Sequence, residues 1–173
     1  MDFKTLLPDF NAIGKTEWGK PSVDTKDTMN LVALVGVVLM VVFVFLPWAK
    51  LTVSALGESA EGSRLGITLW YGIFGLICAL AALVGVLYKH TSLTFCAAVL
   101  GLVFGLIGLL SVPDFTIAGE KVTSDEVKTA LEASKLTKVA GVGGASISHL
   151  GAILYMVASG VTAVAAYLKI AKK

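Results

Sequence analysis

The sequence is short of charge, because Asp, Glu, Lys and Arg make up only 15% of it, against about 25% in soluble domains. The shortage is concentrated in four apolar runs. Each run is about 20 residues long, which is the length a helix needs to cross a hydrocarbon core about 30 Å thick. We therefore predict an all-α membrane protein, a four-helix transmembrane bundle whose spans cover about residues 30–47, 67–88, 92–112 and 147–170.

Cysteines and clustered basic residues are also scarce. The two cysteines, Cys78 and Cys96, lie inside predicted spans, whereas structural disulfides belong to oxidising surroundings outside the membrane. We interpret both as small apolar residues of the bundle. The net charge is only +2 and no basic cluster alternates with aromatic residues, so we expect no nucleic acid partner.

The centres of the four spans contain no charged residue. Transporters and proton relays place ionisable side chains at that depth, because a moving charge needs partners there. His149 lies near the outer end of the fourth span, beside Ser148 and without a nearby acid. We interpret it as an interfacial polar residue rather than a ligand or a proton carrier. We expect no catalytic residue, no metal site, no cofactor and no enzymatic activity.

An even number of spans places both termini on one side of the bilayer. Residues 1–29 form a polar N-terminal arm on that side, and residues 30–173 form the membrane domain. The positive-inside rule counts Lys and Arg near the ends of spans. Eight basic residues lie on the side of the termini and six on the other side. We therefore predict cytoplasmic termini and a location in a plasma membrane or a bacterial inner membrane.

The first outer loop covers residues 48–66. Polar and apolar residues alternate from Lys50 to Ala55, which is typical of a strand with one covered face, and the glycines and serines that follow favour a turn. We predict a β-hairpin that belongs to a small outer β-layer. Trp48 follows the proline that ends the first span, and we expect its ring to anchor that end among the lipid headgroups.

The second outer loop covers residues 113–146. A short strand is predicted near Phe115 and Ile117. Thr123 and Glu126 then have the spacing of a capping box, in which the two side chains bond each other's backbone N–H groups. The apolar residues Val127, Ala130 and Leu131 recur at helical spacing. These features predict one amphipathic helix of about 12 to 14 residues, broken by the glycines at 141, 143 and 144.

The spans are rich in small residues at helical spacing. Such residues let helix backbones approach closely, which matters in lipid because burial from water no longer drives helix association. The predicted helix-packing residues are Gly72, Gly75, Gly101, Gly105, Gly108, Ala152, Ser159 and Ala163. Two alternatives stay open: these residues pack helices within one bundle, or they pack one subunit against another.

A family resemblance comes from the residues around the first outer loop. Leu46-Pro47-Trp48 closes the first span, and Gly66-Ile67-Thr68-Leu69-Trp70 opens the second. With the four-span order, these segments resemble claudins, in which a tryptophan of the first outer segment is followed by a Gly-Leu-Trp motif. Here two residues are inserted between the glycine and the tryptophan of the motif, and the two cysteines that follow the motif in claudins are absent. The resemblance implies a small antiparallel sheet above a left-handed four-helix bundle.

These observations predict a structural or assembly protein that associates laterally with itself or with a larger membrane complex. The predicted outer-loop framework consists of Trp48, Gly66, Trp70, Thr123 and Glu126. The alternative is a channel or transport component with a pore between subunits. Such a pore would be lined by Thr68, Thr94, Ser159 or Thr162.

Overall fold

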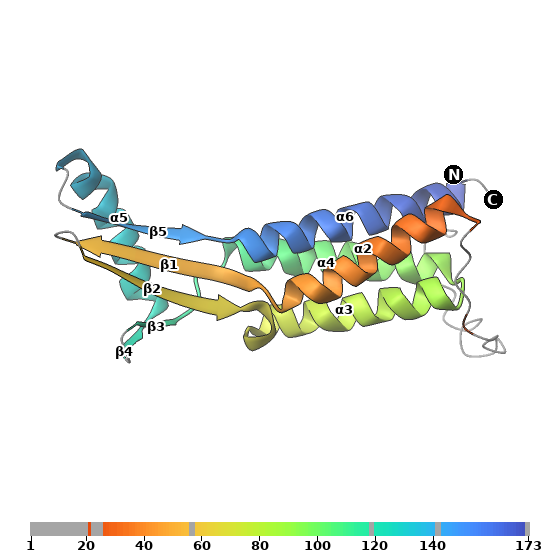
Figure 1. Cartoon of the computed structure of the whole chain (residues 1–173), viewed down its shortest axis with the longest axis horizontal. Helices are drawn as coiled ribbons and strands as arrows, with labels where there is room; N and C mark the ends of the chain where they lie inside the picture. Colours follow the sequence, from red (N-terminus) through yellow and green to blue (C-terminus); the bar gives the residue numbers. More distant parts are fainter. Residues whose placement is uncertain (1–20, 22–25, 56–57, 118–119, 141–142, 172–173) are drawn as a thin grey trace.

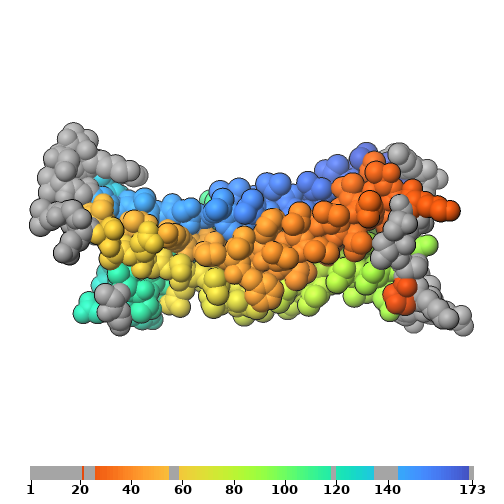
Figure 2. Space-filling model, in the orientation of Figure 1, coloured from red at the N-terminus to blue at the C-terminus, as the bar shows by residue number. Residues whose placement is uncertain are grey.

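The computed structural model describes residue 21 and residues 26–55, 58–117, 120–140 and 143–171. The predicted N-terminal arm therefore lies almost wholly outside the described residues. The molecule is elongated and mostly helical, with a helical bundle at one end and two small antiparallel sheets at the other (Figure 1). Figure 2 shows α2 and the β1–β2 hairpin following one another along one face of this rod.

Four helices form the bundle, namely α2 (Thr28–Val44), α3 (Trp70–Leu87), α4 (Thr91–Leu110) and α6 (Leu150–Ala171). Each packs against two others: α2 and α4 both contact α3 and α6. Asp27 caps α2, because its carboxylate accepts hydrogen bonds from the backbone N–H groups of Met29 and Asn30 at 3.0 and 3.4 Å. The start of α2 and the end of α6 lie at the same end of the bundle (Figure 1).

A tight turn joins α3 to α4. The His90 N–H donates to the Gly85 carbonyl oxygen at 2.8 Å, and the Lys89 N–H donates to the Val86 carbonyl oxygen at 3.3 Å. This is the Schellman pattern of helix termination, which places one residue in the left-handed region and usually has glycine there. Here the residue is Lys89, with a φ of 60°. The two helices are therefore antiparallel neighbours, as the short connection predicts.

The main sheet has three antiparallel strands in the order β2 (Glu58–Leu65), β1 (Pro47–Ala55) and β5 (Gly143–Ser148). The predicted hairpin is confirmed, since Lys50 pairs with Ser63 and Thr52 with Glu61. The third strand was not predicted. It lies in a segment expected to contain the start of the fourth span, and it pairs Leu51 with Ile147. The helix α6 consequently begins at Leu150, three residues later than predicted.

The second sheet is a short hairpin of β3 (Phe115–Ile117) and β4 (Glu120–Val122), and it leads into α5 (Ser124–Ala140). The predicted strand and amphipathic helix are both confirmed, although α5 has 17 residues rather than 12 to 14. Leu51, Phe115 and Val127 are buried together between the main sheet, this hairpin and α5. The sheet end of the molecule therefore has its own apolar core.

All three strands of the main sheet connect almost directly to bundle helices. Two residues separate α2 from β1, and one residue separates β5 from α6. The end of β2 runs into a single turn of 3-10 helix, η2 (Gly66–Thr68), just before α3. Because three strands continue into three helices, the sheet projects along the direction of the bundle (Figure 1).

The outside of the bundle is apolar. Three helices, α3, α4 and α6, are long and apolar enough to cross a membrane by length and composition, and α2 is a shorter apolar helix of 17 residues. Large exposed apolar side chains lie on all four; on α2 they are Leu31, Val32, Val35, Val38, Leu39 and Val42. The buried side is made largely of small residues. This distribution is the opposite of the apolar stripe that a helix in a soluble protein turns inward.

Candidate functional site at the junction of bundle and sheet

The junction between bundle and sheet is built around Trp48, the second residue of β1. Its side chain has no exposed surface, and its indole Nε1–H donates to the Phe43 carbonyl oxygen at 2.8 Å. The expectation that Trp48 anchors the chain among lipid headgroups is therefore wrong. The chain runs from α2 into β1 at Pro47 without reversing (Figure 1), and the Trp48 ring packs into the core beside Met40 and Val44. Trp70 is 58% exposed, as a residue at the membrane surface would be.

Glycines from three other segments leave the space that the indole fills. A Cβ added to Gly66 would lie 2.5 Å from Trp48 Nε1, one added to Gly108 would lie 2.7 Å from Cε3, and one added to Gly151 would lie 2.9 Å from Cδ1. Atoms cannot approach this closely without a shift in the structure. The sequence indicated Gly66 and Gly108, but nothing in the local pattern distinguished Gly151.

Two tyrosines complete the junction. The Trp48 ring lies 5.9 Å from that of Tyr71 in a stacked arrangement and 5.0 Å from that of Tyr155. The Tyr155 hydroxyl is buried and donates to the Gly75 carbonyl oxygen at 2.6 Å. Sequence reasoning missed both tyrosines, although a polar aromatic residue inside an apolar run is a signal that could have drawn attention to them. Together, the three aromatic rings fill the outer end of the bundle.

The predicted helix-packing residues all face the inside of the bundle. A Cβ on Gly72 would overlap the Gly66 carbonyl oxygen, and one on Gly101 would lie 2.6 Å from Ser159 Oγ. The Ser159 hydroxyl in turn donates to the Ala98 carbonyl oxygen at 2.8 Å. The other members, Gly75, Gly105, Gly108, Ala152 and Ala163, are buried as well. These buried positions correspond to the first of the two alternatives, in which the residues pack helices within one bundle.

The residues considered as a pore lining are mostly inside the bundle too. Thr94, Ser159 and Thr162 are at most 2% exposed. The Thr162 hydroxyl donates to the Ala158 carbonyl oxygen at 2.9 Å. Only Thr68 among the four is on the surface. A pore between subunits would therefore lack three of the four polar side chains predicted to line it.

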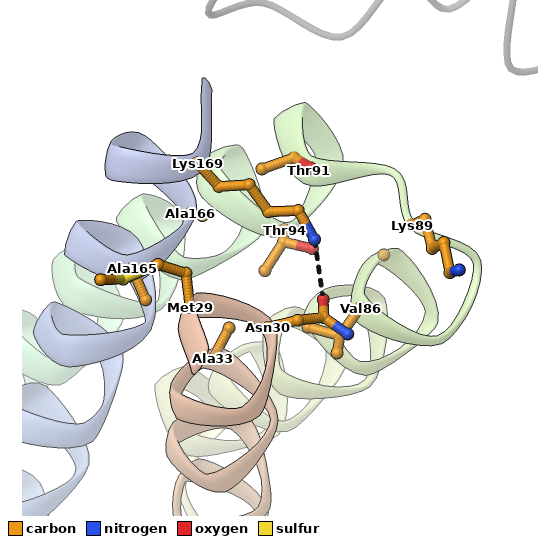
Figure 3. A pocket seen from close by; sticks show the side chains of 11 residues that line it. Met29, Asn30, Ala33, Val86, Lys89, Thr91, Thr94, Ala165, Ala166 and Lys169 are labelled. Carbon is orange, nitrogen blue, oxygen red and sulfur yellow. Dashed lines mark hydrogen bonds between the residues drawn. The ribbon is translucent and has the colours of Figure 1, made fainter. Parts of the chain in front are cut away.

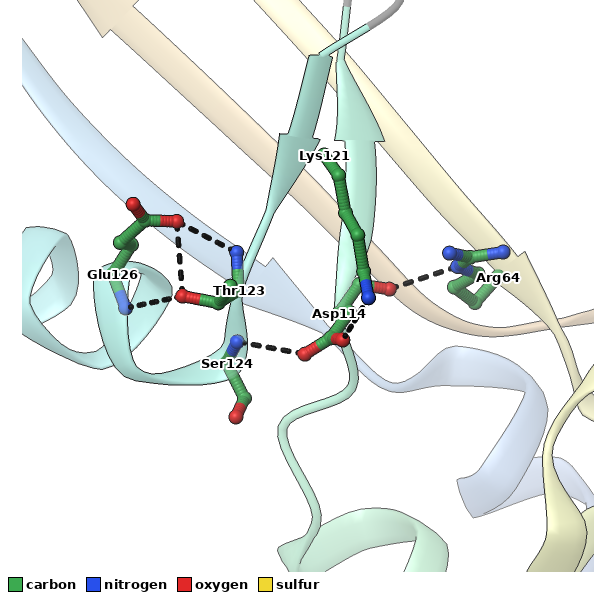
Figure 4. Close-up of polar contacts among 6 residues, drawn as sticks. All are labelled: Arg64, Asp114, Lys121, Thr123, Ser124 and Glu126. Atoms are coloured by element: carbon green, nitrogen blue, oxygen red, sulfur yellow. Dashed lines mark hydrogen bonds and ion pairs between the residues drawn. The ribbon is translucent and has the colours of Figure 1, made fainter.

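The capping box of α5 is formed as predicted. The Thr123 N–H donates to Glu126 Oε2 at 2.7 Å, and the Glu126 N–H donates to Thr123 Oγ1 at 3.5 Å (Figure 4). Acceptance of the hydrogen bond from the Thr123 backbone lowers the pKa of the Glu126 carboxyl group. The carboxylate is therefore charged at neutral pH, which suits the positive end of the helix dipole.

Asp114 links the outer elements to one another. Its carboxylate accepts a hydrogen bond from the Ser124 N–H at 2.9 Å and forms an ion pair with Lys121 at 3.2 Å. Its carbonyl oxygen accepts a hydrogen bond from Arg64 Nε of β2 at 2.8 Å (Figure 4). The bond from Ser124 is the main reason that the pKa of Asp114 is lowered. These contacts tie β2, β4 and the start of α5 into one outer unit.

His149, the residue between β5 and α6, is half-buried. One ring nitrogen, Nε2, lies 3.3 Å from the Ser111 carbonyl oxygen at the end of α4. Burial lowers the pKa of the imidazole, so the ring is mostly neutral at pH 7. A neutral ring that donates to this backbone carbonyl links the end of α4 to the start of α6.

Within the described residues, no three His, Cys, Asp or Glu side chains come close enough to hold a metal ion. Comparison of the chain with protein-family models, with curated proteins and with solved structures finds no match. The junction thus joins buried aromatic rings and glycine backbones; the Tyr155 hydroxyl is hydrogen-bonded, whereas the buried Tyr71 hydroxyl has no partner among the described residues. Such an arrangement can hold a sheet in a set position on a bundle.

Proposed function

We propose that the protein is an integral membrane protein and that α2, α3, α4 and α6 all cross the bilayer. The apolar outer surface of all four helices supports this proposal. The 17 residues of α2 are at the lower end of the range of about 17 to 25 residues for spanning helices. Phe45 and Leu46 extend its apolar stretch. The termini would lie in the cytoplasm and the sheets outside, in a plasma or bacterial inner membrane.

Cysteine labelling tests this topology. In a chain with Cys78 and Cys96 replaced by alanine, we expect an impermeant maleimide to label Ser59→Cys in intact cells, because Ser59 lies on the exposed β2 strand. The matched control, Lys89→Cys at the opposite end of the bundle, should react only after the membrane is permeabilised. The reverse pattern would show that the orientation is opposite to the one proposed. Equal labelling of both sites in intact cells would argue against four spans.

For the function itself, we infer a non-enzymatic structural or assembly role: the bundle holds the outer unit in a defined orientation for association with further copies or with a larger complex. The observation that carries this inference is the burial of Trp48 among glycines of three other segments. The buried Trp48 side chain fixes the position of β1, and with it the sheet, relative to the bundle. With about 3.3 Å per strand residue, the nine residues of β1 span roughly 30 Å from the end of the bundle to the tip of the sheet.

The claudin-like resemblance concerns the sheet above the bundle, whereas the channel alternative depends on polar side chains at the bundle surface. An antiparallel sheet above a four-helix bundle is what the resemblance implies, and membership in that family stays a prediction. The channel alternative is weakened by the burial of Thr94, Ser159 and Thr162. Because the helix-packing glycines face inward, lateral association would use the outer unit or the large apolar side chains on the outside of the bundle.

Mass measurement of the full chain in lipid nanodiscs tests the assembly role. We expect particles that contain more than one copy, or one copy with a co-purified partner, and no solute flux above protein-free liposomes. Strictly single-chain particles without a partner would contradict the assembly role. Flux above background would favour the channel. One purified sample is divided between nanodiscs for the mass and liposomes for the flux, so both measurements start from the same folded protein.

A further inference from the structure

A small pocket opens at the end of the bundle opposite the sheets. All four bundle helices contribute to its wall (Figure 3). Its polar lining includes Asn30 of α2, Thr94 of α4, Lys169 of α6 and Lys89 of the turn between α3 and α4. The enclosed space is about 10 Å³, which is enough for one atom-sized group.

Asn30 is the unusual member of this lining. It is only 3% exposed, and its Oδ1 accepts a hydrogen bond from Lys169 Nζ at 3.3 Å. An ammonium group can only donate, so this contact establishes which end of the amide is the oxygen. The amide nitrogen, Nδ2, is then left buried without a hydrogen-bond partner. An unpaired buried donor is costly, which indicates that an acceptor belongs in the pocket.

The charges around the pocket favour an anionic acceptor. Asp27 offsets the charge of Lys169, with which it forms an ion pair at 2.9 Å, so the net positive charge at the wall comes from Lys89. Among the described acidic residues, only Asp27 lies at this end of the bundle. The α4 helix also begins here, at Thr91, and its N-cap His90 makes no side-chain capping bond. The first N–H groups of a helix attract negative charge.

The hydroxyl of Thr94 does not replace the missing acceptor. It donates to the His90 carbonyl oxygen at 3.3 Å, and Asn30 Nδ2 has no bond to it. The space admits one oxygen atom but not a whole phosphate. A ligand would therefore insert one anionic oxygen and keep the remainder at the mouth, where the side chain of Lys89 is exposed.

We propose that this pocket binds one oxygen of a phosphate group, with Asn30 Nδ2 and Lys89 as the principal donors. Two sources share this chemistry, a phospholipid headgroup and a free phosphate ion. The lipid source rests on the proposed membrane topology, which places this end of the bundle at the bilayer surface. The phosphate chemistry itself rests only on the described side chains.

Two variants separate ligand binding from stability. Asn30→Asp keeps an oxygen for Lys169 and has nearly the same size, but it replaces the amide donor with a negative oxygen. Lys89→Gly removes the ammonium group and places glycine at a left-handed position, where glycine is favoured. Its melting temperature should therefore be unchanged or higher. The control is Lys121→Gln, which removes an exposed positive charge on β4 at the other end of the molecule.

The binding experiment uses the full chain and two probes. Native mass spectrometry counts phosphatidylglycerol retained from nanodiscs, and calorimetry in neutral detergent measures the binding of inorganic phosphate. We expect wild type and Lys121→Gln to bind alike. Asn30→Asp and Lys89→Gly should bind about tenfold more weakly or worse, because each loses a charge-assisted or buried hydrogen bond to the phosphate.

The outcomes distinguish the sources and can overturn the proposal. Retention of phosphatidylglycerol without binding of inorganic phosphate supports a lipid headgroup, and binding of both supports a general phosphate site. Binding of neither probe by wild type overturns the proposal. So does undiminished binding by Lys89→Gly with an unchanged or raised melting temperature, a result that remains informative even if Asn30→Asp fails to fold. The mass of the particles tests the assembly role separately.

Discussion

Replacement of Trp48 by alanine should lower the free energy of unfolding by about 3 to 5 kcal/mol, the range for large aromatic residues removed from a packed core. The indole is fully buried, and the backbones at Gly66, Gly108 and Gly151 are shaped around it. None of these glycines can supply side-chain atoms to refill the space. Because Trp48 is the second residue of β1, we also expect faster amide hydrogen exchange in the β1–β2 hairpin.

Trp70→Ala is the matched control for this prediction. Trp70 is 58% exposed and contacts Tyr71 and Phe74 edge-on, and such aromatic pairs are worth about 1 kcal/mol. Unfolding by sodium dodecyl sulfate in mixed micelles, followed by circular dichroism, measures both variants. Equal losses for the two tryptophans would contradict the central place of Trp48, as would unchanged exchange in the hairpin.

The second large effect is expected from Gly72→Ala. The added methyl group would fall on the Gly66 carbonyl oxygen, and a backbone atom cannot rotate away as the end of a side chain can. We therefore expect a loss at the upper end of overpacking effects, about 3 kcal/mol, together with poor expression of folded protein. A displaced η2 turn would also disturb the Gly66 contact with Trp48.

The helix α6 offers a matched glycine control. Nothing lies within 4 Å of a Cβ built on Gly160, so the added methyl group meets open space. Because alanine is a better helix former than glycine by about 1 kcal/mol, Gly160→Ala should be neutral or stabilising. Thermal unfolding of both variants in the same detergent is the measurement. Similar destabilisation by the two substitutions would show that the loss of glycine itself, rather than its neighbour, determines the effect.

Several elements of this structure could be predicted because their causes are local. The apolar runs identify the bundle helices to within a few residues. The alternation from Lys50 onward predicts the hairpin, and the spacing of Thr123 and Glu126 predicts where α5 begins. In each case the decisive residues lie within a few positions of one another. A chain so patterned forms these elements largely regardless of what they later contact.

The candidate sites could be predicted only in part. The interior position of the helix-packing residues was one of two alternatives, because a small residue on a helix allows close approach by any neighbour. Trp48 was noticed but assigned to the membrane surface, where tryptophans at the ends of spans usually lie. Asn30 gave no local signal, since an asparagine at the end of a span is ordinary. That its Nδ2 lacks a hydrogen-bond partner can be recognised only from the tertiary structure, in which Lys169 donates to Asn30 Oδ1.

The sequence by itself determined the four helices, their order, the low charge of their surfaces and the presence of structured outer loops. Only the tertiary structure decided that β5 completes the sheet, by pairing with β1 some 90 residues away. It also decided that Trp48 is enclosed by Gly66, Gly108 and Gly151. The physical reason is separation along the sequence. Hydrophobic periodicity and helix capping involve residues a few positions apart, whereas burial depends on which distant segments contact each other.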